Sequence, residues 1–344
     1  MKSFAMNLLT AALTLLLLAG LSLPARNAFL EAREQHAAAP VVVDGPWPKP
    51  ARDPRRVFGA YVDPWHVDDW SRSIGAAPQM VAKFEAFSRR RTPAATLEQA
   101  QRLGISRALI SWEPWAPVPT SLGTRGQAQP QPGYRNIDIA RGAQDRYILA
   151  FARSLARFKG TVYLRYAHEM NGYWYPWSHG AQAYVWAWRR IVRIFEVARA
   201  ENVRFVWSVN PNLYEGAATW KRTLARYWPG SRYVDDIGST MIDFGGAKSY
   251  PVRRFEPRLR WLHKTFKRKV VLTEVNTAYD GRMPWLRDFR AMLAEMPWIP
   301  AVAWSQLPSR GKAHQIGTGV VDWDVQTDPA AGQELRAIIE DGLR

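Results

Sequence analysis

The chain reads TVYLRYAHEMNGYWYPW from Thr161 to Trp177, where an alternating apolar segment runs into an acid, an amide and several aromatic side chains. Side chains alternate between the two faces of a strand. One face of this segment is apolar until His168, which is typical of a strand that packs against helices. The other face carries Tyr163, Arg165, Ala167 and Glu169. The pattern predicts a buried strand whose second face points into a barrel and ends on Glu169.

Arg165 and His168 are the two residues of this strand that need a particular environment. An unpaired charge inside a barrel is very costly, so we expect Arg165 to be paired with an acid. The pair would hold the structure together below a site, or the guanidinium would contact a ligand. By strand alternation, His168 belongs to the face that packs against the helices, so its side chain reaches the lumen only if the strand bends at its end. Otherwise it supports the site from behind.

Seven further strand-like runs have the same apolar, β-branched or aromatic character, at 57–62, 79–87, 106–112, 203–210, 233–242, 269–275 and 301–306. Segments with helical spacing lie between them, at 67–75, 94–103, 143–158, 181–200, 217–228, 256–267, 284–295 and 332–341. Eight strands alternating with eight helices over about 285 residues have the size and rhythm of a (β/α)₈ TIM barrel. The alternative is a doubly wound α/β sheet, but no glycine-rich phosphate turn follows any strand. The sequence therefore predicts a single α/β barrel.

Two segments precede the barrel, which we expect to fill residues 57–344. The almost wholly apolar run from Leu8 to Leu23 suits either the core of a signal peptide or a membrane anchor over residues 1–23. No clean cleavage site follows it at once, so both alternatives stay open. Either one predicts export, to the periplasm or the medium. Residues 24–56 are rich in proline, alanine and charge, which is the composition of a linker.

Composition excludes some classes of site and narrows others. The chain has no cysteine, which excludes disulfides and cysteine-ligated metals, and its six histidines lack the HxxxH-type spacing of a metal-dependent hydrolase. We therefore expect neither a metal nor a cofactor. The net charge of +17 would suit nucleic acid, an anionic membrane surface or an acidic polymer. Because the arginines are dispersed and match no nucleic-acid motif, we expect a solvated basic surface that favours an acidic polymer, and no nucleic-acid partner.

The working residues of such barrels gather at the carboxyl ends of the strands. The runs end on or close to Asp63, Glu113, Glu169, Asn210, Glu274 and Trp304. Nearby indoles come from Trp65, Trp112, Trp115, Trp174, Trp177, Trp207 and Trp285. Flat rings stack on the apolar faces of sugars, while carboxylates and amides bind hydroxyls and move protons. The combination favours a carbohydrate site, although we expect most of the 17 tryptophans to pack in the core.

Glu169 and Glu274 end the fourth and seventh runs, which lie roughly opposite each other in an eight-stranded barrel. Glycoside hydrolases typically use two carboxyl groups that face each other across the bond to be cleaved. One must be protonated to donate to the leaving oxygen, and the other must be ionised to attack the anomeric carbon. A separation of about 5–5.5 Å implies retention of configuration, and a longer one implies inversion. We predict these two glutamates as the catalytic pair.

The segment HEMNG-x-W-x-P-W at 168–177 resembles the acid/base segment of glycoside hydrolase family 26, the β-mannanase-like (β/α)₈ enzymes. The likeness continues in order from residue 57 through FGAYV, ISWEPW, VWSVNPN, YWPGSRYVDDIG, LTEVN and AVAWSQ. It implies a retaining double displacement with Glu169 as the general acid/base and Glu274 as the nucleophile. The substrate-binding residues that it implies are His168, Asn171 and Trp174 beside the acid, and Trp304 as an aromatic platform on strand eight. The strand ends add Trp112, Glu113, Trp177 and Asn210 as predicted substrate contacts.

One departure from the family pattern lies in the sixth strand. The family continues Val-Gly-x-Asp-x-Tyr, and its tyrosine hydrogen-bonds the nucleophile. Here Ile237-Gly238 continues Ser239-Thr240-Met241-Ile242, so Thr240 and Ile242 stand in the aspartate and tyrosine places. The change removes a hydroxyl that would hold Glu274 ionised and aligned, unless Tyr250 in the following loop replaces it. The expectation of standard β-mannanase activity is weakened, and the fold prediction is not.

The leading hypothesis is an exported retaining glycoside hydrolase that cleaves internal β-glycosidic bonds of a polysaccharide. The resemblance implies mannan, with mixed-linkage glucan, xylan and the cell's own exopolysaccharide as alternatives. The second hypothesis, favoured by the change in strand six, is a weakly active protein that binds the polysaccharide or assists its export. Retention of both glutamates argues for the enzyme, because a binding protein has no need of them. A metal-dependent hydrolase ranks third, and the sequence does not indicate an oligomeric state.

Overall fold

The computed structural model describes residues 55–117, 128–245, 249–277, 282–305, 325 and 328–343. The predicted N-terminal segment at 1–23 and nearly all of the predicted linker at 24–56 lie outside the described residues. In the part of the chain that the structure describes, no helix has both the length and the apolar character needed to cross a bilayer.

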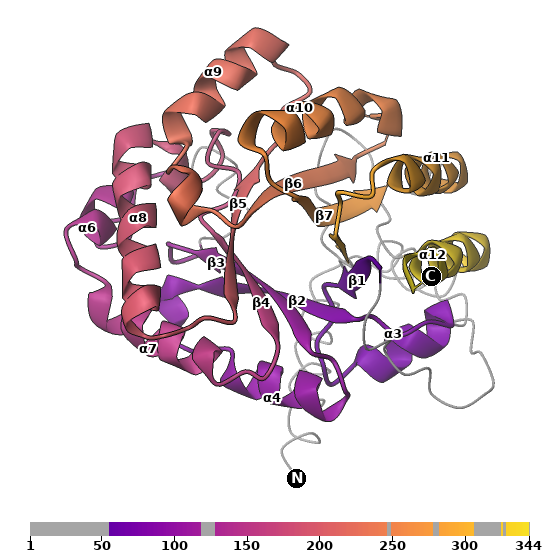
Figure 1. Cartoon of the computed structure of the whole chain (residues 1–344), viewed down its shortest axis with the longest axis horizontal. Helices are drawn as coiled ribbons and strands as arrows, with labels where there is room; N and C mark the ends of the chain where they lie inside the picture. The colour runs from indigo at the N-terminus through magenta and orange to yellow at the C-terminus, as the bar shows by residue number, and fades with distance from the viewer. Residues whose placement is uncertain are drawn as a thin grey trace, which may run out of the picture.

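Eight parallel strands close into a barrel in chain order, and β8 is hydrogen-bonded to β1 (Figure 1). The strands are β1 (Val57–Ala60), β2 (Met80–Ala86), β3 (Arg107–Glu113), β4 (Thr161–Tyr166), β5 (Val203–Val209), β6 (Asp236–Asp243), β7 (Val270–Thr277) and β8 (Ala301–Trp304). Each strand overlaps one of the eight predicted runs. The prediction of a (β/α)₈ barrel is confirmed.

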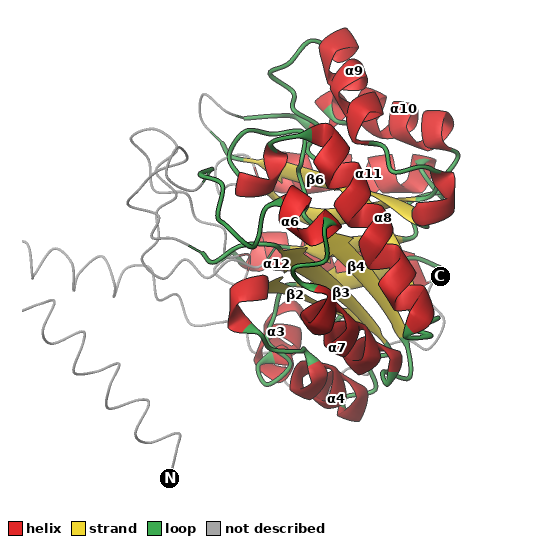
Figure 2. Ribbon diagram, turned by 90° about the vertical axis from the view of Figure 1, so that its left-hand side faces the viewer, coloured by secondary structure: helices red, strands yellow, loops and turns green. Residues whose placement is uncertain are grey.

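Helices pack around the outside of this barrel (Figures 1 and 2). The α-helices are α3 (Val67–Ile74), α4 (Ala94–Arg102), α6 (Asn136–Ala140), α7 (Asp145–Ala156), α8 (Ala181–Val197), α9 (Ala217–Tyr227), α10 (Glu256–Phe266), α11 (Arg282–Glu295) and α12 (Pro329–Leu343). Short 3₁₀ helices are η1 (Phe87–Arg89), η3 (Pro176–Ser178), η4 (Ser231–Tyr233) and η6 (Val252–Arg254). Every predicted helical segment overlaps one of the α-helices, and the short α6 has no counterpart among the predicted segments.

Helix α8 illustrates why these segments become helices that pack on the barrel. Its buried side chains include Tyr184, Trp188, Ile191 and Phe195, which recur every three or four residues. That spacing places them on one face of the helix, so a single apolar stripe contacts the strands while the opposite face meets solvent.

The core has two layers, because each strand of a parallel barrel buries both faces. The barrel interior is filled by Val57, Met80, Ala82, Leu109, Tyr163, Val206, Val271, Ala301 and Ala303. A second, larger cluster joins the other faces of the strands to the helices, and it contains Trp112, Trp207 and Trp304.

Gly238 on β6 allows β5 and β6 to approach closely at the upper end of the interior. Gly238 is paired with Ser208 of β5, and a Cβ atom at Gly238 would lie 2.6 Å from the Cβ of Ser208. No real side chain tolerates such a distance, so glycine is required there. The Ser208 hydroxyl thus lies above the apolar residues of the barrel interior, at the level where polar side chains begin.

Candidate active site

Strand β4 ends at Tyr166, and the chain then turns sharply. Ala167 and Glu169 have φ angles of 43° and 52°, in the left-handed region that non-glycine residues rarely adopt. Backbone hydrogen bonds hold the turn, because Glu169 N–H donates to the Ser208 carbonyl at 2.9 Å and Gly172 N–H donates to the Glu169 carbonyl at 2.9 Å. Backbone held in such conformations is concentrated at functional sites. The turn breaks the strand alternation, so His168 and Glu169 no longer point to opposite faces.

His168 is buried beneath the aromatic loop that follows β4. Its Nε2 atom is 3.1 Å from the Tyr175 hydroxyl, and its ring lies 5.9 Å from that of Phe84 on β2. Trp177 supports this residue, since its Nε1 donates to the His168 carbonyl at 2.6 Å and its ring is stacked on Tyr175. Burial, together with the nearby Arg165 cation, lowers the pKa of His168 well below its ordinary value. The bend that would bring His168 toward the mouth is present, and the imidazole there is neutral.

Glu169 accepts hydrogen bonds from three side chains. Trp174 Nε1 donates to one carboxylate oxygen at 2.9 Å, and Asn210 Nδ2 donates to the other at 2.9 Å. The Thr240 hydroxyl donates to that second oxygen as well. Asn171 fixes Asn210 through a pair of hydrogen bonds with the Asn210 backbone, at 2.8 and 2.9 Å. The structure therefore brings the predicted residues Asn171, Trp174 and Asn210 together around the predicted acid.

Arg165 lies fully buried in the barrel interior, toward the carboxyl ends of the strands, and forms an ion pair with Glu274. Its other bonds go to hydroxyl groups: to Ser208 at 2.8 Å, to Ser111 at 3.1 Å and to Thr240 at 3.3 Å. The expectation that Arg165 is paired with an acid is confirmed. Because three hydroxyl groups also bond its planar fork, the guanidinium holds the Glu274 carboxylate in a fixed position.

A β-bulge turns Glu274 into the barrel. The pairing of β6 with β7 shifts between Ser239, which pairs with Leu272, and Thr240, which pairs with Glu274. Thr273 is the extra residue, and its hydroxyl lies 3.0 Å from that of Ser208 inside the barrel. Two successive residues of β7 thus contact the interior, which a regular strand does not allow. The bulge is what brings Glu274 to Arg165.

The two glutamates share one buried cation. Arg165 contacts Glu274 directly, and it contacts Glu169 through the Thr240 hydroxyl, which accepts from Arg165 and donates to Glu169. Burial raises the pKa of Glu274, the Arg165 charge opposes that rise, and the Glu169 charge adds to it. The carboxyl groups of β4 and β7 therefore lie in one electrostatically coupled group at the carboxyl ends of the strands.

The departure in strand six has a different consequence from the one expected. Thr240 supports Glu169, while the group that bonds Glu274 is Arg165. Tyr250 packs edge to face against Tyr214, with ring centroids 5.3 Å apart. Tyr61, which follows β1, extends its hydroxyl into the barrel, 3.0 Å from both the Ser111 hydroxyl and the Thr273 carbonyl. Tyr61 was not among the predicted site residues, although it lies on the same strand face as Val57 and Gly59 in the first run.

Glu113 ends β3 and is almost fully buried. It accepts a hydrogen bond from Trp115 Nε1 at 3.2 Å. Burial raises its pKa to about 7, the Trp115 hydrogen bond opposes the rise, and the Glu274 charge adds to it. Glu113 therefore lies within electrostatic range of Glu274 and changes charge near neutral pH.

Glu113→Gln is expected to flatten the pH dependence of the unfolding free energy. The folded-state pKa of about 7 exceeds the ordinary value of 4.5, so the stability that Glu113 contributes is full below pH 4.5 and is lost as the pH rises through 7. The shift corresponds to about 3 kcal/mol across that window. Urea unfolding of wild type and variant between pH 4 and 8 measures it. Equal slopes in the two proteins would contradict the burial of an ionisable group here.

Three of the predicted substrate contacts, Trp112, Trp177 and Trp304, have fully buried rings, and their contact with a substrate stays a prediction. Trp112 stacks on Phe151 of α7 with centroids 4.3 Å apart, and its Nε1 donates to the Tyr147 hydroxyl at 3.2 Å. It precedes the inward-facing Glu113, so strand alternation turns it toward the helices. Trp304 is likewise buried in the cluster between strands and helices, whereas its neighbour Ala303 faces the interior. None of the three has an open ring face in this structure.

No metal site emerges from the described residues, since no three or more of their His, Asp and Glu side chains are grouped so that they could hold an ion. The chemistry that the arrangement offers is that of two carboxyl groups, a neutral imidazole and a partly exposed indole at Trp174.

Comparisons with known proteins find similarity to proteins named as an endoglucanase and a β-1,3-xylanase. No family model matches the chain. Endoglucanase H of Acetivibrio thermocellus is 31% identical over 150 residues, which are 41% of this chain and 14% of that protein. The β-1,3-xylanase TXYA of a Vibrio species is 25% identical over 174 residues, which are 50% of this chain and 35% of that protein. The chain thus spans well under half the length of these relatives.

Among solved structures, the family 26 β-mannanase of Bacteroides ovatus superposes with a TM-score of 0.55 at 16% identity, covering 85% of this chain and 90% of that one. Because the sequence identity is this low, the structural similarity is evidence for the fold alone. Together with the closed eight-stranded barrel, it leads to one conclusion: the chain has the (β/α)₈ fold of the glycoside hydrolase family 26 mannanases.

Proposed function

We propose that the protein is a retaining glycoside hydrolase that cleaves β-linked bonds within a polysaccharide, with Glu169 as general acid/base and Glu274 as nucleophile. The observation that carries this proposal is the shared cation. Arg165 binds Glu274 directly and reaches Glu169 through Thr240, which joins two carboxyl groups from β4 and β7. A purely structural ion pair would need one acid, whereas this arrangement holds two at the carboxyl ends of the strands, where barrel enzymes do their chemistry.

The proposed reaction has two steps. In the first, a Glu274 oxygen attacks the anomeric carbon and the bond to the leaving oxygen breaks, while Glu169 gives its proton to that oxygen. In the second, Glu169 takes a proton from water, whose oxygen attacks the same carbon and releases Glu274. Arg165 favours the ionised Glu274 that begins the reaction. Once Glu274 is esterified, the Arg165 charge remains to stabilise the Glu169 carboxylate through Thr240.

We propose a mannan-type β-glycan as the substrate. Support comes from the family 26 likeness of the segment at 168–177 and from the β-mannanase with the same fold. The names of the sequence relatives make β-glucan and β-1,3-xylan the other glycans to be tested. We further propose that the protein is exported, because the apolar run from Leu8 to Leu23 has the character of a signal or an anchor.

The proposal is tested by a reducing-sugar assay on β-1,4-mannan, mixed-linkage β-glucan and β-1,3-xylan. Wild type is expected to cleave at least one of them, and Glu169→Ala and Glu274→Ala are expected to bind it without turnover. Glu98→Ala is the matched control, because Glu98 is an exposed glutamate on α4 whose partner is Arg102. Full activity in either catalytic variant would refute the assignment. Binding without turnover by wild type would favour the reading as a polysaccharide-binding protein.

Thr240→Val is expected to lower kcat by about 10- to 100-fold, since a hydrogen bond to a charged group contributes about 1.5–3 kcal/mol. Valine keeps the shape of threonine but removes the hydroxyl that links Arg165 to Glu169. Thr240→Ser keeps that hydroxyl and serves as the control. Steady-state kinetics on the cleaved glycan give the comparison, and equal kcat values for the valine and serine variants would show that the link has no role.

A further inference from the structure

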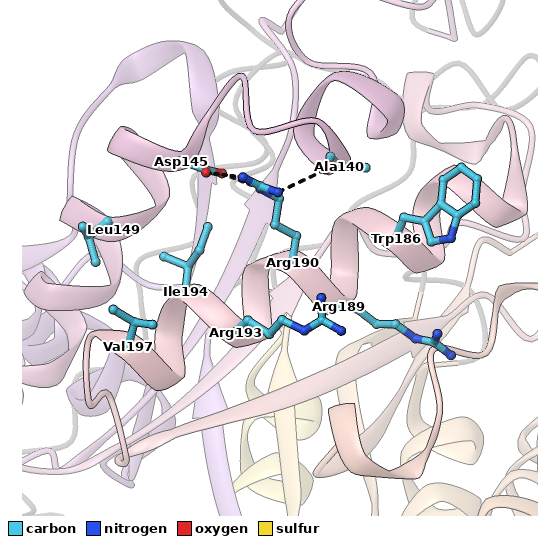
Figure 3. A pocket seen from close by; sticks show the side chains of 9 residues that line it. All are labelled: Ala140, Asp145, Leu149, Trp186, Arg189, Arg190, Arg193, Ile194 and Val197. Atoms are coloured by element: carbon cyan, nitrogen blue, oxygen red, sulfur yellow. Dashed lines mark hydrogen bonds and ion pairs between the residues drawn. The ribbon is translucent and has the colours of Figure 1, made fainter.

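A groove of about 530 Å³ lies on the outer face of α8, beside α6 and α7 (Figure 3). Its lining comes from the solvent side of α8, together with Ala140 of α6 and Asp145 and Leu149 of α7. The glutamates of the candidate active site belong to the carboxyl ends of β4 and β7, inside the ring of helices. The groove is therefore separate from the candidate active site, and helices alone form it.

The α8 wall of this groove has a regular composition. Trp186, Arg190, Arg193 and Val197 recur at positions i, i+4, i+7 and i+11, which places them on one face of the helix. This face is opposite to the stripe that packs on the barrel. Trp186 is 50% exposed and Val197 is 77% exposed. The open indole of Trp186 offers a flat apolar face on which a sugar ring can stack.

The charge of the groove is positive. Arg190 is neutralised by an ion pair with Asp145 and also contacts the Ala140 carbonyl (Figure 3). Arg189 donates to the Pro229 carbonyl at 2.8 Å and lies over the Tyr233 ring, which are uncharged partners. Arg193 donates to the Tyr233 hydroxyl at 3.4 Å. In the part of the chain that the structure describes, neither Arg189 nor Arg193 forms an ion pair, so both charges are available to an anion.

We propose that this groove is a second glycan-binding site, which takes an anionic, uronate-containing polysaccharide. Such a polymer has flat sugar faces for Trp186 and a carboxylate on the ring for Arg189 and Arg193. The overall charge of +17 attracts a polyanion from a distance and agrees with this ligand. A concave groove admits a single chain, whereas an anionic lipid surface presents a plane that contacts protruding side chains. The proposal is independent of Glu169 and Glu274.

The test is direct binding of polygalacturonate to the whole protein, measured by isothermal titration calorimetry at two salt concentrations. Wild type is expected to bind, and to bind more weakly at high salt, because exposed charges are screened. The variant Arg189→Gln/Arg193→Gln and the variant Trp186→Ala are each expected to weaken binding by about tenfold or more. Both variants are expected to keep the hydrolytic activity of the wild type on a neutral β-glycan.

The matched control is Arg222→Gln/Arg226→Gln on the neighbouring helix α9. These two arginines are exposed, are also four residues apart and do not line the groove, so the variant removes the same charge elsewhere. It is expected to bind polygalacturonate within about twofold of wild type, since a distant exposed charge contributes little. Equal weakening in both double variants would overturn the proposal, because the attraction would then be a property of the whole surface.

Vesicles containing phosphatidylglycerol form the second arm of the experiment. Vesicle binding that depends on Arg189 and Arg193, without binding of polygalacturonate, would overturn the proposal in favour of a lipid surface. Binding that does not change with salt would overturn it as well. Because the readout is binding to an acidic polymer, a protein without glycosidase activity would still give the expected result. Failure of this inference is therefore distinguishable from failure of the proposed function.

Discussion

Replacing Glu274 with alanine is expected to lower kcat on the cleaved glycan by on the order of 10⁶-fold, the scale seen when a hydrolase loses its nucleophile. Glu274 is turned into the barrel by the bulge at Thr273 and is held there by Arg165. Glu169 keeps its bonds to Trp174, Asn210 and Thr240, so the variant retains its proton donor but lacks the nucleophile. Alanine leaves the buried Arg165 charge without its acid, so the variant is also expected to lose about 3–5 kcal/mol of stability, and circular dichroism checks that it is folded before the kinetics are measured.

Azide rescue separates this role from that of Glu169. In Glu274→Ala, azide fills the space of the lost carboxylate, attacks the anomeric carbon and is expected to give the α-glycosyl azide from an activated aryl β-glycoside. In Glu169→Ala, the Glu274 ester still forms and azide replaces the attacking water, so the β-glycosyl azide is expected. Proton NMR distinguishes the two products. The same anomer from both variants, or the two anomers exchanged, would contradict the assignment of roles.

Replacing Arg165 with methionine is expected to destabilise the protein by about 3–5 kcal/mol at neutral pH, the cost of leaving a buried charge without its partner. Arg165 is fully buried and is the cation in contact with Glu274. Its charge opposes the rise in the pKa of Glu274, so the variant's Glu274 has a still higher pKa. A group with a raised folded-state pKa lowers the free energy of unfolding as the pH increases. The variant's loss of unfolding free energy should therefore be smaller at acidic pH and larger at alkaline pH.

Urea unfolding at pH 5 and pH 8 measures both the deficit and its pH dependence. Arg165→Lys keeps a charge but loses the planar fork, so it should recover part of the stability and little of the activity. Arg336→Met is the control for an exposed ion pair, that with Glu340 on α12, and should cost at most about 1 kcal/mol. A deficit in Arg165→Met that is the same at both pH values would mean that lost packing, and not the unpaired Glu274, causes it.

Much of the fold follows from local sequence patterns. The alternation of apolar runs with helical spacing predicts eight strands and eight helices, and each of them is present. The phase of strand β4 predicts that Arg165 is inside the barrel and paired with an acid, because a buried lone charge is too costly. The acid itself is Glu274, 109 residues further along the chain, and strand alternation alone does not identify it.

The parts of the site that the sequence did not predict depend on irregular backbone. The bulge at Thr273 breaks the period of two that any phase argument uses, and the left-handed Ala167 and Glu169 do the same at the end of β4. The regular period of two also explains why Trp112 is buried against the helices. The residue that precedes an inward-facing Glu113 must face outward. The alternation of side chains along the strand therefore indicates the direction of Trp112 better than its closeness to the strand end does.

The hydroxyl groups around Arg165 were missed for a different reason. Ser111, Ser208, Thr240 and Thr273 come from four separate strands, and each is an ordinary strand residue in its own segment. Their common role depends on the closed barrel, which brings them to one level around one guanidinium. Only the register between the strands reveals it.

The central claim is that Glu169 and Glu274 act as a retaining pair. The most direct test is proton NMR of the anomeric centre of the first product, recorded within minutes of adding wild-type protein to a short β-linked oligosaccharide. Two displacements at one carbon return it to its original configuration, so the β-anomer is expected to form first and to mutarotate afterwards. Initial formation of the α-anomer would contradict the account, because it would require a single displacement by water and no ester at Glu274.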